Sequence, residues 1–269
     1  MSDALLDAVQ RGVQIYDLGR PLFAGMPQSP NHAKFTHVLP RRHGDWVRPD
    51  GGSAASDLLV MGTHVGTHID ALAHVSHDGK LFGGADASRI RGGGYPDHGV
   101  HTIAPMVRRG VLLDIPRALG VDACAAAYEV TPADLDAATA DVELGADDVA
   151  LIRTGWGRRF DDGADAYLGK ATGVPGVGEA GAVWLAERRI HAAGADTIAF
   201  EHLPAGAGHA VLPAHRVLLV ENGIYIVEAL DLESLAASGR REFTFVLVPL
   251  NISGATGSPV RPLAVVTGD

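Results

Sequence analysis

The chain has 269 residues, of which 46% are hydrophobic and 20% are charged, and its formal net charge at pH 7 is −10. This composition is typical of a globular protein with a sizeable core, and it argues against a largely disordered chain. The negative charge would repel phosphate backbones and anionic lipid headgroups on average, so nucleic acids and membrane surfaces are poor candidate partners.

The N-terminal residues favour a cytoplasmic location. They contain two early acids, Asp3 and Asp7, and no basic segment that leads into an apolar run, so they do not resemble a signal peptide. No apolar run approaches the ~20 residues that a membrane span needs. Cys124 is the only cysteine, which excludes an intrachain disulfide, and we interpret it as a small core residue.

The first half of the chain contains three short, apolar segments typical of β-strands, at residues 15–18, 111–115 and 149–153. Residues 31–55 carry many polar residues, prolines and glycines, which indicates loops or a hairpin at the surface. A helix is predicted from residue 131 to about 140, because a threonine can cap it and a proline occupies its first helical position.

The second half of the chain alternates between helical and extended patterns. Residues 179–193 have apolar side chains at a period near 3.6 residues and predict a helix that ends at Gly194. A shorter helix is predicted at residues 215–222. The branched and apolar segments around these helices predict strands at residues 197–200, 224–228 and 243–248.

Together these elements predict an α/β fold. Strands and helices alternate, but the strands are many and the helices few, which favours a mixed sheet with helices on it over a barrel of eight βα units. We find no internal repeat, low-complexity block or interdomain linker, so residues 1–269 are predicted to form a single domain.

Four side chains between residues 64 and 74 have the chemistry of a metal site: His64, His68, Asp70 and His74. Imidazole and carboxylate groups are donors that suit zinc, manganese or iron. In a regular helix Asp70 would point away from His68, because two residues are about 200° apart. In a flat strand His64 and His68 would lie about 13 Å apart, which is too far to share an ion.

A bend between the two histidines would bring them together. Gly66 permits such a bend, since it lacks a Cβ, and Thr67 can form a hydrogen bond within the turn or to a ligand carboxylate. This segment therefore predicts a strand–turn–strand clip around a metal ion. The alternative is four polar residues in a loop, because a His-x-x-x-His pair is weak evidence and Val65 excludes the His-Glu-x-x-His protease motif.

The segment His64-Val65-Gly66-Thr67-His68-Ile69-Asp70-Ala71-Leu72-Ala73-His74 resembles the signature His-x-Gly-Thr-His-x-Asp-x-Pro-x-His of the cyclase-like metal hydrolases. This family includes bacterial kynurenine formamidase and isatin hydrolase. The match is complete except at Leu72, where the family has proline. The similarity extends to three further segments, so that it spans nearly the whole chain: residues 16–22, 213–228 and 248–262.

The resemblance implies a single compact β/β/α domain with a mixed sheet. It also implies a homodimer or larger homo-oligomer, whose sites can be completed by a neighbouring subunit. His64, His68 and Asp70 would bind a first divalent ion, Zn or Mn, and Asp70, His215 and Glu228 would bind or support a second when two ions are present. From the residues alone, Glu228 is equally well explained as a solvated residue at the end of a strand.

Other histidines and aromatic residues leave alternatives open. His202 or His209 can take the place of His215, whereas His32 is expected to be a surface or structural residue. Four aromatic side chains are candidates for the wall of a substrate pocket or for the core: Phe23, Phe35, Trp46 and Phe82.

His74 matches the catalytic histidine of the family, and amide hydrolysis needs such a group. Coordination to a divalent ion lowers the pKa of water from about 15.7 to about 7, so that metal-activated water is the expected nucleophile. The departing nitrogen needs a proton, which a histidine with a pKa near ~6.5 can take from water and return. No Gly-x-Ser-x-Gly elbow is present, which counts against a serine hydrolase.

We therefore predict a metal-dependent amidohydrolase that cleaves a C–N bond in a small N-acyl (arylformamide) or cyclic amide, with an aromatic substrate as one option. One alternative is a metal-dependent cyclase or lactonase acting on an ester or carbonyl substrate. Another is a non-catalytic, metal-dependent ligand-binding protein of the same fold. The presence of His74 favours an enzyme, because binding alone needs no proton shuttle.

Overall fold

The computed structural model of the chain describes residues 3–268, which are built around a nine-stranded mixed sheet of order β1-β13-β11-β5-β7-β9-β10-β4-β12. Its four central strands are parallel: β5 (Met106–Asp114), β7 (Val149–Arg153), β9 (Ala192–Ala195) and β10 (Tyr225–Glu228). Antiparallel strands flank them, with β1 (Val13–Asp17), β13 (Leu263–Thr267) and β11 (Glu242–Leu247) on one side and β4 (His68–Asp70) and β12 (Gly257–Pro259) on the other.

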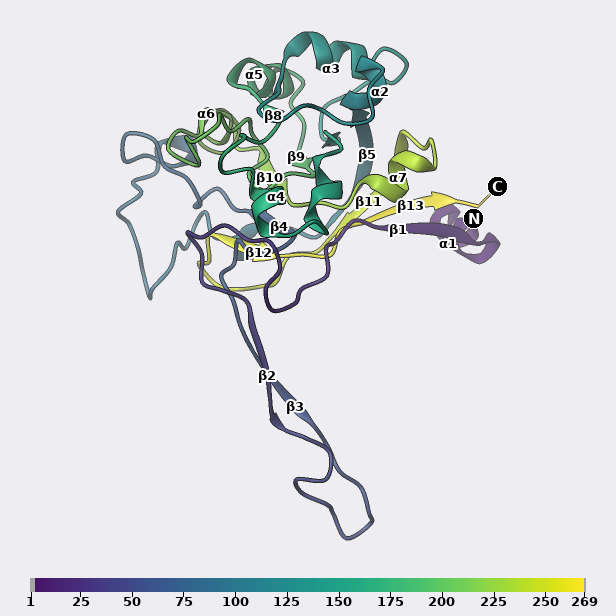
Figure 1. Ribbon diagram of the computed structural model, residues 1–269, viewed down its shortest axis with the longest axis vertical. Coiled ribbons are helices and arrows are strands. Elements are labelled where there is room, and N and C mark those ends of the chain that lie inside the picture. Colours follow the sequence, from purple (N-terminus) through teal and green to yellow (C-terminus); the bar gives the residue numbers. More distant parts are fainter. Residues whose placement is uncertain (1–2, 269) are drawn as a thin grey trace.

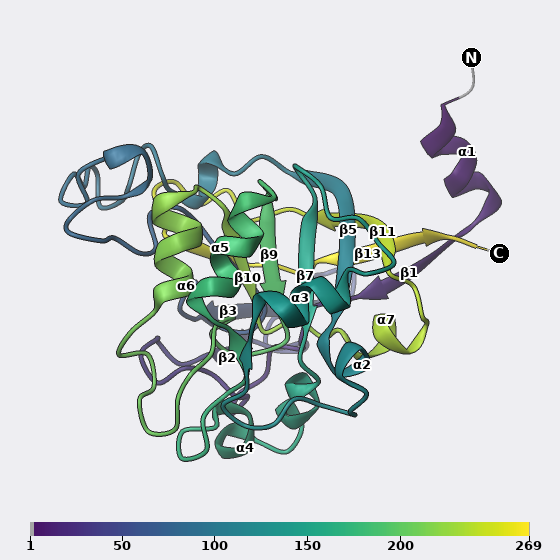
Figure 2. The ribbon, with the colours of Figure 1, turned by 90° about the horizontal axis from the view of Figure 1, so that it is seen from above.

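Helices cover one face of the parallel strands. Figure 2 shows α3 (Pro132–Ala138), α5 (Glu179–Glu187) and α6 (Pro213–His215) on this face, and α6 continues into the π-helical turn η4 (Arg216–Glu221). The remaining elements lie around the sheet: α1 (Ala4–Arg11), α2 (Ile115–Leu119), α4 (Ala164–Leu168), α7 (Glu233–Ala237), η1 (Phe82–Gly84), η2 (Val100–Thr102), η3 (Trp156–Phe160), β6 (Glu129–Val130) and β8 (Gly176–Val177). Among residues 3–268, no helix has the length and apolar character needed to cross a bilayer.

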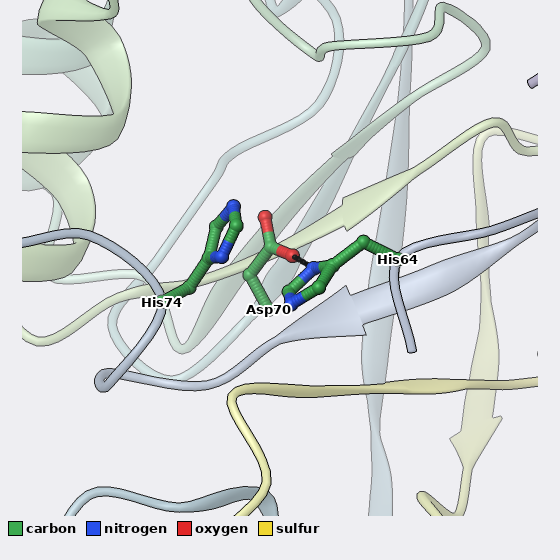
Figure 3. Close-up of side chains that lie close together, drawn as sticks. All are labelled: His64, Asp70 and His74. Atoms are coloured by element: carbon green, nitrogen blue, oxygen red, sulfur yellow. Dashed lines mark hydrogen bonds and ion pairs between the residues drawn. The ribbon is translucent and has the colours of Figure 1, made fainter. Parts of the chain in front are cut away.

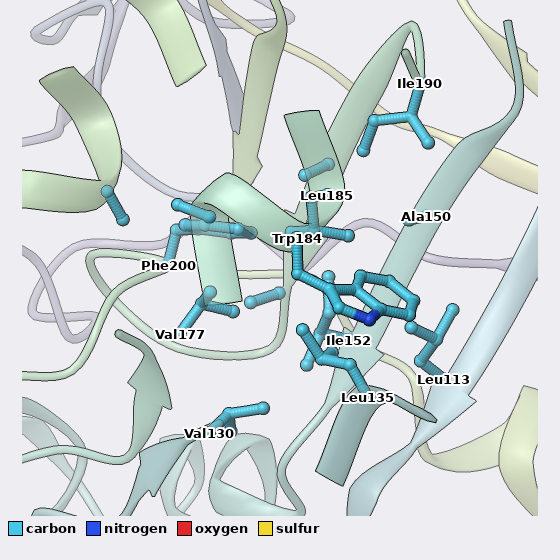
Figure 4. Close-up of a cluster of buried hydrophobic side chains, with 14 of the residues drawn as sticks. Leu113, Val130, Leu135, Ala150, Ile152, Val177, Trp184, Leu185, Ile190 and Phe200 are labelled. Carbon is cyan, nitrogen blue, oxygen red and sulfur yellow. The ribbon is translucent and has the colours of Figure 1, made fainter. Parts of the chain in front are cut away.

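The parallel strands are buried on both faces, and their alternating side chains form two cores. On the helix-covered face, Leu113 and Ile152 pack with Leu185 of α5 (Figure 4). On the opposite face, Leu112 and Leu151 pack with side chains of β11 and β13, because the sheet curls. Full burial of each such side chain contributes about 1.5–3 kcal/mol. The predicted mixed sheet with helices on it is confirmed.

Most of the predicted elements are present. Strands β1, β5, β7, β10 and β11 cover the segments predicted as strands near residues 15, 111, 149, 224 and 243. Helix α3 begins after Thr131, whose side chain accepts a hydrogen bond from the N–H of Asp134 while the carboxylate of Asp134 accepts one from the N–H of Thr131. This reciprocal cap explains why the start of α3 could be predicted from the sequence.

The predicted helix at 179–193 is confirmed over residues 179–187, but its predicted end is wrong, and so is the predicted strand at 197–200. Helix α5 ends at Glu187, Arg189 adopts a left-handed φ of +54°, and the strand is β9 at Ala192–Ala195. Gly194 does not end a helix but lies in this central strand, where a Cβ would lie 2.8 Å from Leu230 Cδ1 and 3.0 Å from Leu151 Cδ2. Close packing requires small residues in β9, and small residues lack the branched pattern used to predict strands.

A two-stranded hairpin projects from the body of the protein (Figure 1), and we call it the arm. It consists of β2 (Thr36–Arg41), β3 (Ser56–Val60) and the loop between them, so a surface hairpin is confirmed, although its second strand lies wholly beyond the predicted range of 31–55. Five apolar side chains of its strands are between 45% and 52% exposed: Val38, Leu39, Leu58, Leu59 and Val60. Adjacent strand residues face opposite sides, so both faces of the arm are apolar and solvent-accessible.

A buried hydroxyl group connects three distant segments beside β4. Thr67 Oγ1 accepts a hydrogen bond from the backbone N–H of Arg20 at 2.8 Å and donates one to the carbonyl oxygen of Ala229 at 2.7 Å. The predicted bond within the turn or to a ligand carboxylate is therefore wrong. Because Thr67 is only 2% exposed, water cannot replace its hydroxyl group.

We expect Thr67→Val to lower the free energy of unfolding by about 1–3 kcal/mol, since it preserves the side-chain shape but leaves two buried backbone groups without partners. Equilibrium urea denaturation at a fixed protein concentration measures this change. Thr67→Ser, which retains the hydroxyl group, is the control and should be less destabilised. Equal stability of the Val and Ser variants would contradict the assigned role.

Candidate functional site

The chain bends sharply between His64 and His68. Gly66 lies at the bend with a left-handed φ of +70°, and a Cβ at this position would lie 2.4 Å from Leu22 Cδ2. The predicted bend at this glycine is confirmed. The residues before it form a turn and not the predicted strand, so that only the second half of the clip, β4, is extended.

The pairing of β4 with β10 and β12 positions the next groups. Glu228 of β10 lies opposite His68, and paired residues project from the same face of the sheet, so Glu228 Oε2 reaches to 3.4 Å from His68 Nε2. Gly257 of β12 lies opposite Asp70. A Cβ on Gly257 would lie 2.4 Å from His64 Cε1, so the lack of a side chain there makes room for the imidazole.

Asp70 is the centre of the cluster and is 0% exposed. Its Oδ1 accepts a hydrogen bond from His64 Nδ1 at 2.7 Å, and Figure 3 shows its carboxylate between the rings of His64 and His74. Its Oδ2 accepts no hydrogen bond, and the Nε2 of His215 is 3.6 Å away. An unpaired, buried carboxylate oxygen is unfavourable, so this position fits a bound cation.

His215 and Glu228 reach the cluster from two other elements. His215 is the last residue of α6, and its Nε2 lies 3.1 Å from Glu228 Oε1 at the end of β10. Glu228 is 6% exposed, so its interpretation as a solvated residue at the end of a strand is wrong. The structure therefore brings together all six side chains singled out in the sequence.

The possible ligand atoms form two groups that share Asp70. Atoms of His68, Asp70 and Glu228 lie within 4.8 Å of one another, and so do atoms of His64, Asp70 and His74. The sequence-based assignment placed His64 and His68 in the same site, so the grouping in the structure differs from it. A shared carboxylate is compatible with one ion or with two.

The electrostatic environment keeps both carboxylates ionised at neutral pH. Burial would raise the pKa of Asp70, but His74 and the other surrounding histidines hold it well below its usual range. Burial and Asp70 would also raise the pKa of Glu228, but its bonds with His215 and His68 lower it to about 2. Ionised carboxylates of this kind are suited to bind a cation.

His74 differs from the other histidines because it lies at the edge of the cluster. Its ring stacks on that of His64, with centroids 3.9 Å apart and planes 26° apart. Burial lowers the pKa of His74 to about 4, against the opposing effect of Asp70. The ring is therefore neutral at pH 7 and can accept a proton.

A cavity of about 40 Å³ adjoins the cluster, with room for a few water molecules or the reacting end of a small substrate. His68, His74, His215 and other cluster residues line it, and the remaining walls come from six side chains: Ser29, His32, Ile198, Ala199, His209 and Leu212. The four aromatic candidates for a pocket wall do not line this cavity. Trp46 and Phe23 are 54% and 46% exposed, so they do not belong to the core.

Several residues near the cluster were not predicted. His32 was expected to be a surface or structural residue, but it lines the cavity and stacks on His64 at a centroid distance of 5.3 Å. Thr256 Oγ1 lies 2.9 Å from His64 Nε2, and Glu201 Oε1 lies 2.6 Å from His215 Nδ1. Both residues are far from their partners in the chain, and no motif marks them.

The two alternatives to His215 differ in their positions. His209 also lines the cavity, close to Asn31, whereas His202 does not belong to the cavity lining. The position within reach of Asp70 and Glu228 is taken by His215.

Comparison with known proteins supports the resemblance noted in the sequence. A family model described as putative cyclase matches residues 16–202. Isatin hydrolase of Roseibium aggregatum is 28% identical over 229 residues, covering 81% of this chain and 77% of that protein. Kynurenine formamidase of Geobacillus thermodenitrificans is 25% identical over 248 residues, covering 91% and 94%. The crystal structure of a novel cyclase superposes with a TM-score of 0.83 at 30% identity, covering 96% of this chain and 91% of that one.

We expect Asp70→Asn to weaken binding of Zn²⁺ and Mn²⁺ by at least about 100-fold, more than the loss of an outer-shell partner. The amide keeps the shape of the side chain but removes the charge that both groups of ligand atoms share. Calorimetric titration of the metal-stripped protein measures the affinity. Asp161→Asn, at an exposed position, is the control and should bind as the wild type does. Wild-type affinity in the Asp70 variant would exclude a metal site at this cluster.

Proposed function

The chain belongs to the putative cyclase family, and on this basis we propose that it is a metal-dependent amidohydrolase that cleaves a C–N bond of a small N-acyl or cyclic amide. Two of its relatives are an isatin hydrolase and a kynurenine formamidase, which supports hydrolysis as the reaction class. The observation on which the proposal rests is the buried Asp70 carboxylate, which is surrounded by potential ligands and leaves one oxygen unpaired.

The cluster suits one or two divalent ions, and we propose Zn²⁺ or Mn²⁺. Its donors are imidazole nitrogens and carboxylate oxygens, which both ions accept. His68, Glu228 and His215 would hold an ion on one side of Asp70, and His64 lies on the other. When bound, such an ion supplies a water molecule of lowered pKa and polarises the scissile carbonyl group.

His74 is the residue proposed to move the proton. Its neutral ring can accept a proton from water at an imidazole nitrogen and pass it to the departing nitrogen of the amide. Its place at the edge of the cluster and in the cavity lining supports this role. Because the cavity is small, we expect the rest of the substrate to lie towards Ser29, His32 and His209.

The main alternative is a cyclase or lactonase that acts on an ester or a carbonyl compound. The same cluster can stabilise the oxyanion of an ester, but an alcohol leaving group needs a proton less than an amide nitrogen does. A dependence of turnover on His74 therefore favours the amide substrate. A non-catalytic binding protein of the same fold would have no need for His74.

We further infer that the arm is covered by a second copy of the chain in a homodimer or larger homo-oligomer. An isolated two-stranded hairpin is marginally stable in water, yet the arm extends from the body with apolar residues on both faces (Figure 1). Exposed apolar patches of this kind mark interfaces between proteins. The resemblance to the cyclase-like metal hydrolases also implies a homodimer or larger homo-oligomer, which supports this inference.

We expect the metal-loaded protein to hydrolyse N-formylkynurenine or isatin faster than simple lactones, as followed by absorbance. His74→Ala should keep its metal but lose at least about 100-fold in kcat, the lower end of the usual contribution of general acid–base catalysis.

The exposed His77→Ala variant is the matched control and should retain wild-type turnover. Turnover of lactones alone would support the alternative enzyme, and no turnover of any of these substrates would favour a binding protein. Unchanged kcat in the His74 variant would exclude its role as the proton shuttle.

We expect the wild type to form a dimer or larger assembly, and a Leu58→Asp/Leu59→Asp variant to shift towards the monomer, because each face of the arm then carries a buried charge in the assembly. Size-exclusion chromatography with light scattering measures the mass. Val121→Asp, at a comparably exposed apolar position on the body, is the control. A monomeric wild type would contradict the inference.

A further inference from the structure

Glu201 is a third buried carboxylate beside the cluster, and it lies outside both groups of potential ligands. It is 1% exposed, and its Oε1 accepts a hydrogen bond from His215 Nδ1 at 2.6 Å. The same carboxylate accepts hydrogen bonds from the backbone N–H groups of Ala214 at 3.0 Å and His215 at 3.3 Å. All of these donors lie in the turn that presents His215 to the cluster.

The contact with Glu201 determines which nitrogen of His215 is available. An ionised carboxylate can only accept hydrogen bonds, so Nδ1 must carry the proton. Nε2 then faces the other way, 3.1 Å from Glu228 Oε1 and 3.6 Å from Asp70 Oδ2. The imidazole thus lies between an acceptor on one edge and the candidate metal position on the other.

The backbone around Glu201 is held in an unfavourable conformation. Phe200 directly precedes Glu201, is buried, and has a left-handed φ of +58°, which is unfavourable for a residue other than glycine. Hydrogen bonds to Val177 of β8 hold both sides of this turn, one to the carbonyl of Phe200 and one from the N–H of His202. A Cβ at Gly176 would lie 2.3 Å from the carbonyl carbon of Glu201, so only glycine fits there.

Such local strain is tolerated where the surrounding structure fixes a functional geometry. At this turn, the strained backbone and the glycine of β8 together fix the place of one carboxylate. That carboxylate has two possible roles, which differ in their consequences. A cap of the α6 backbone alone would affect stability, whereas control of the His215 ring would affect the ion that the ring binds.

We propose that Glu201 is a positioning residue that holds His215 with Nδ1 protonated and Nε2 directed at the metal position between Asp70 and Glu228. This inference rests on the proposed metal site and extends it to a residue that touches neither ion nor substrate. Carboxylates that accept the second N–H of a ligating histidine fix its tautomer and orientation. Their loss weakens metal binding by about 10- to 100-fold.

Glu179 offers a matched control, because it contacts the same turn from α5. It forms an ion pair with Arg216, the residue after His215, from an exposed position in the first turn of α5. Glu179→Gln therefore makes the same chemical change as Glu201→Gln close to the same segment, without touching the imidazole. Any general effect of losing a carboxylate near α6 appears in both variants.

The test is calorimetric titration of metal-stripped wild type, Glu201→Gln and Glu179→Gln with Zn²⁺ and, separately, Mn²⁺. We expect Glu201→Gln to bind at least one ion about 10- to 100-fold more weakly, and Glu179→Gln to bind within about twofold of the wild type. Absorption spectra of the Co²⁺-loaded proteins should differ between the wild type and Glu201→Gln, because the ring orientation changes. Thermal melting of the stripped proteins reports the contribution of the cap separately.

Wild-type affinity and an unchanged Co²⁺ spectrum in Glu201→Gln would overturn the positioning role while leaving the metal site intact. An equal loss in Glu179→Gln would also overturn it. If the wild type binds neither ion, the proposed function fails and this inference fails with it. Should Glu201→Gln not fold, Glu201→Asp provides the test: its shorter side chain withdraws the carboxylate from Nδ1, and wild-type affinity in that variant overturns the proposal.

Discussion

The burial of the Asp70 carboxylate is the constraint on which the rest of the site depends. A charge inside the protein is tolerated only when other groups compensate it, and Asp70 is compensated by His64 on one oxygen and by His215 at a longer distance from the other. At that distance Oδ2 accepts no hydrogen bond, and a bound cation would offset the cost of burying it. The cluster is therefore better understood as a site organised around an ion than as a set of satisfied core residues.

Two glycines and the register of one strand pair position the side chains around Asp70. Gly66 allows the bend that brings His64 back towards Asp70, and Gly257 leaves the space that the His64 ring occupies. The pairing of β4 with β10 then places Glu228 opposite His68. Since a shift of the register by one residue would turn Glu228 to the other face, the sheet itself enforces the position of this carboxylate.

The segment from His64 to His74 could be predicted because it is encoded locally, whereas His215 and Glu228 were assigned mainly through the resemblance of residues 213–228 to the family. The residues of β4 and the bend at Gly66 lie within a short segment, so the number of residues between the ligands limits which backbone shapes can bring them together. The strands with branched side chains were likewise predicted from short, local patterns. Glu201 and Thr256 could not be predicted, because only the tertiary fold brings them to their histidines. Strand β9 was not predicted, because tight packing around Gly194 requires small residues, and small residues lack the branched side chains by which strands are recognised.

The two roles proposed for histidine in this cluster correspond to two different electrostatic environments. Burial would lower the pKa of His68, but its contacts with Glu228 and Asp70 raise it to about 9. Burial also dominates at His74, and there the pKa falls to about 4, because the charges of His64 and His215 add to the effect of burial and Asp70 does not outweigh them. Groups whose pKa values are driven apart in this way commonly have different roles in catalysis. The carboxylates that stabilise a proton on His68 can stabilise a metal cation in its place once that proton is released, whereas the neutral ring of His74 is suited to the proposed proton transfer.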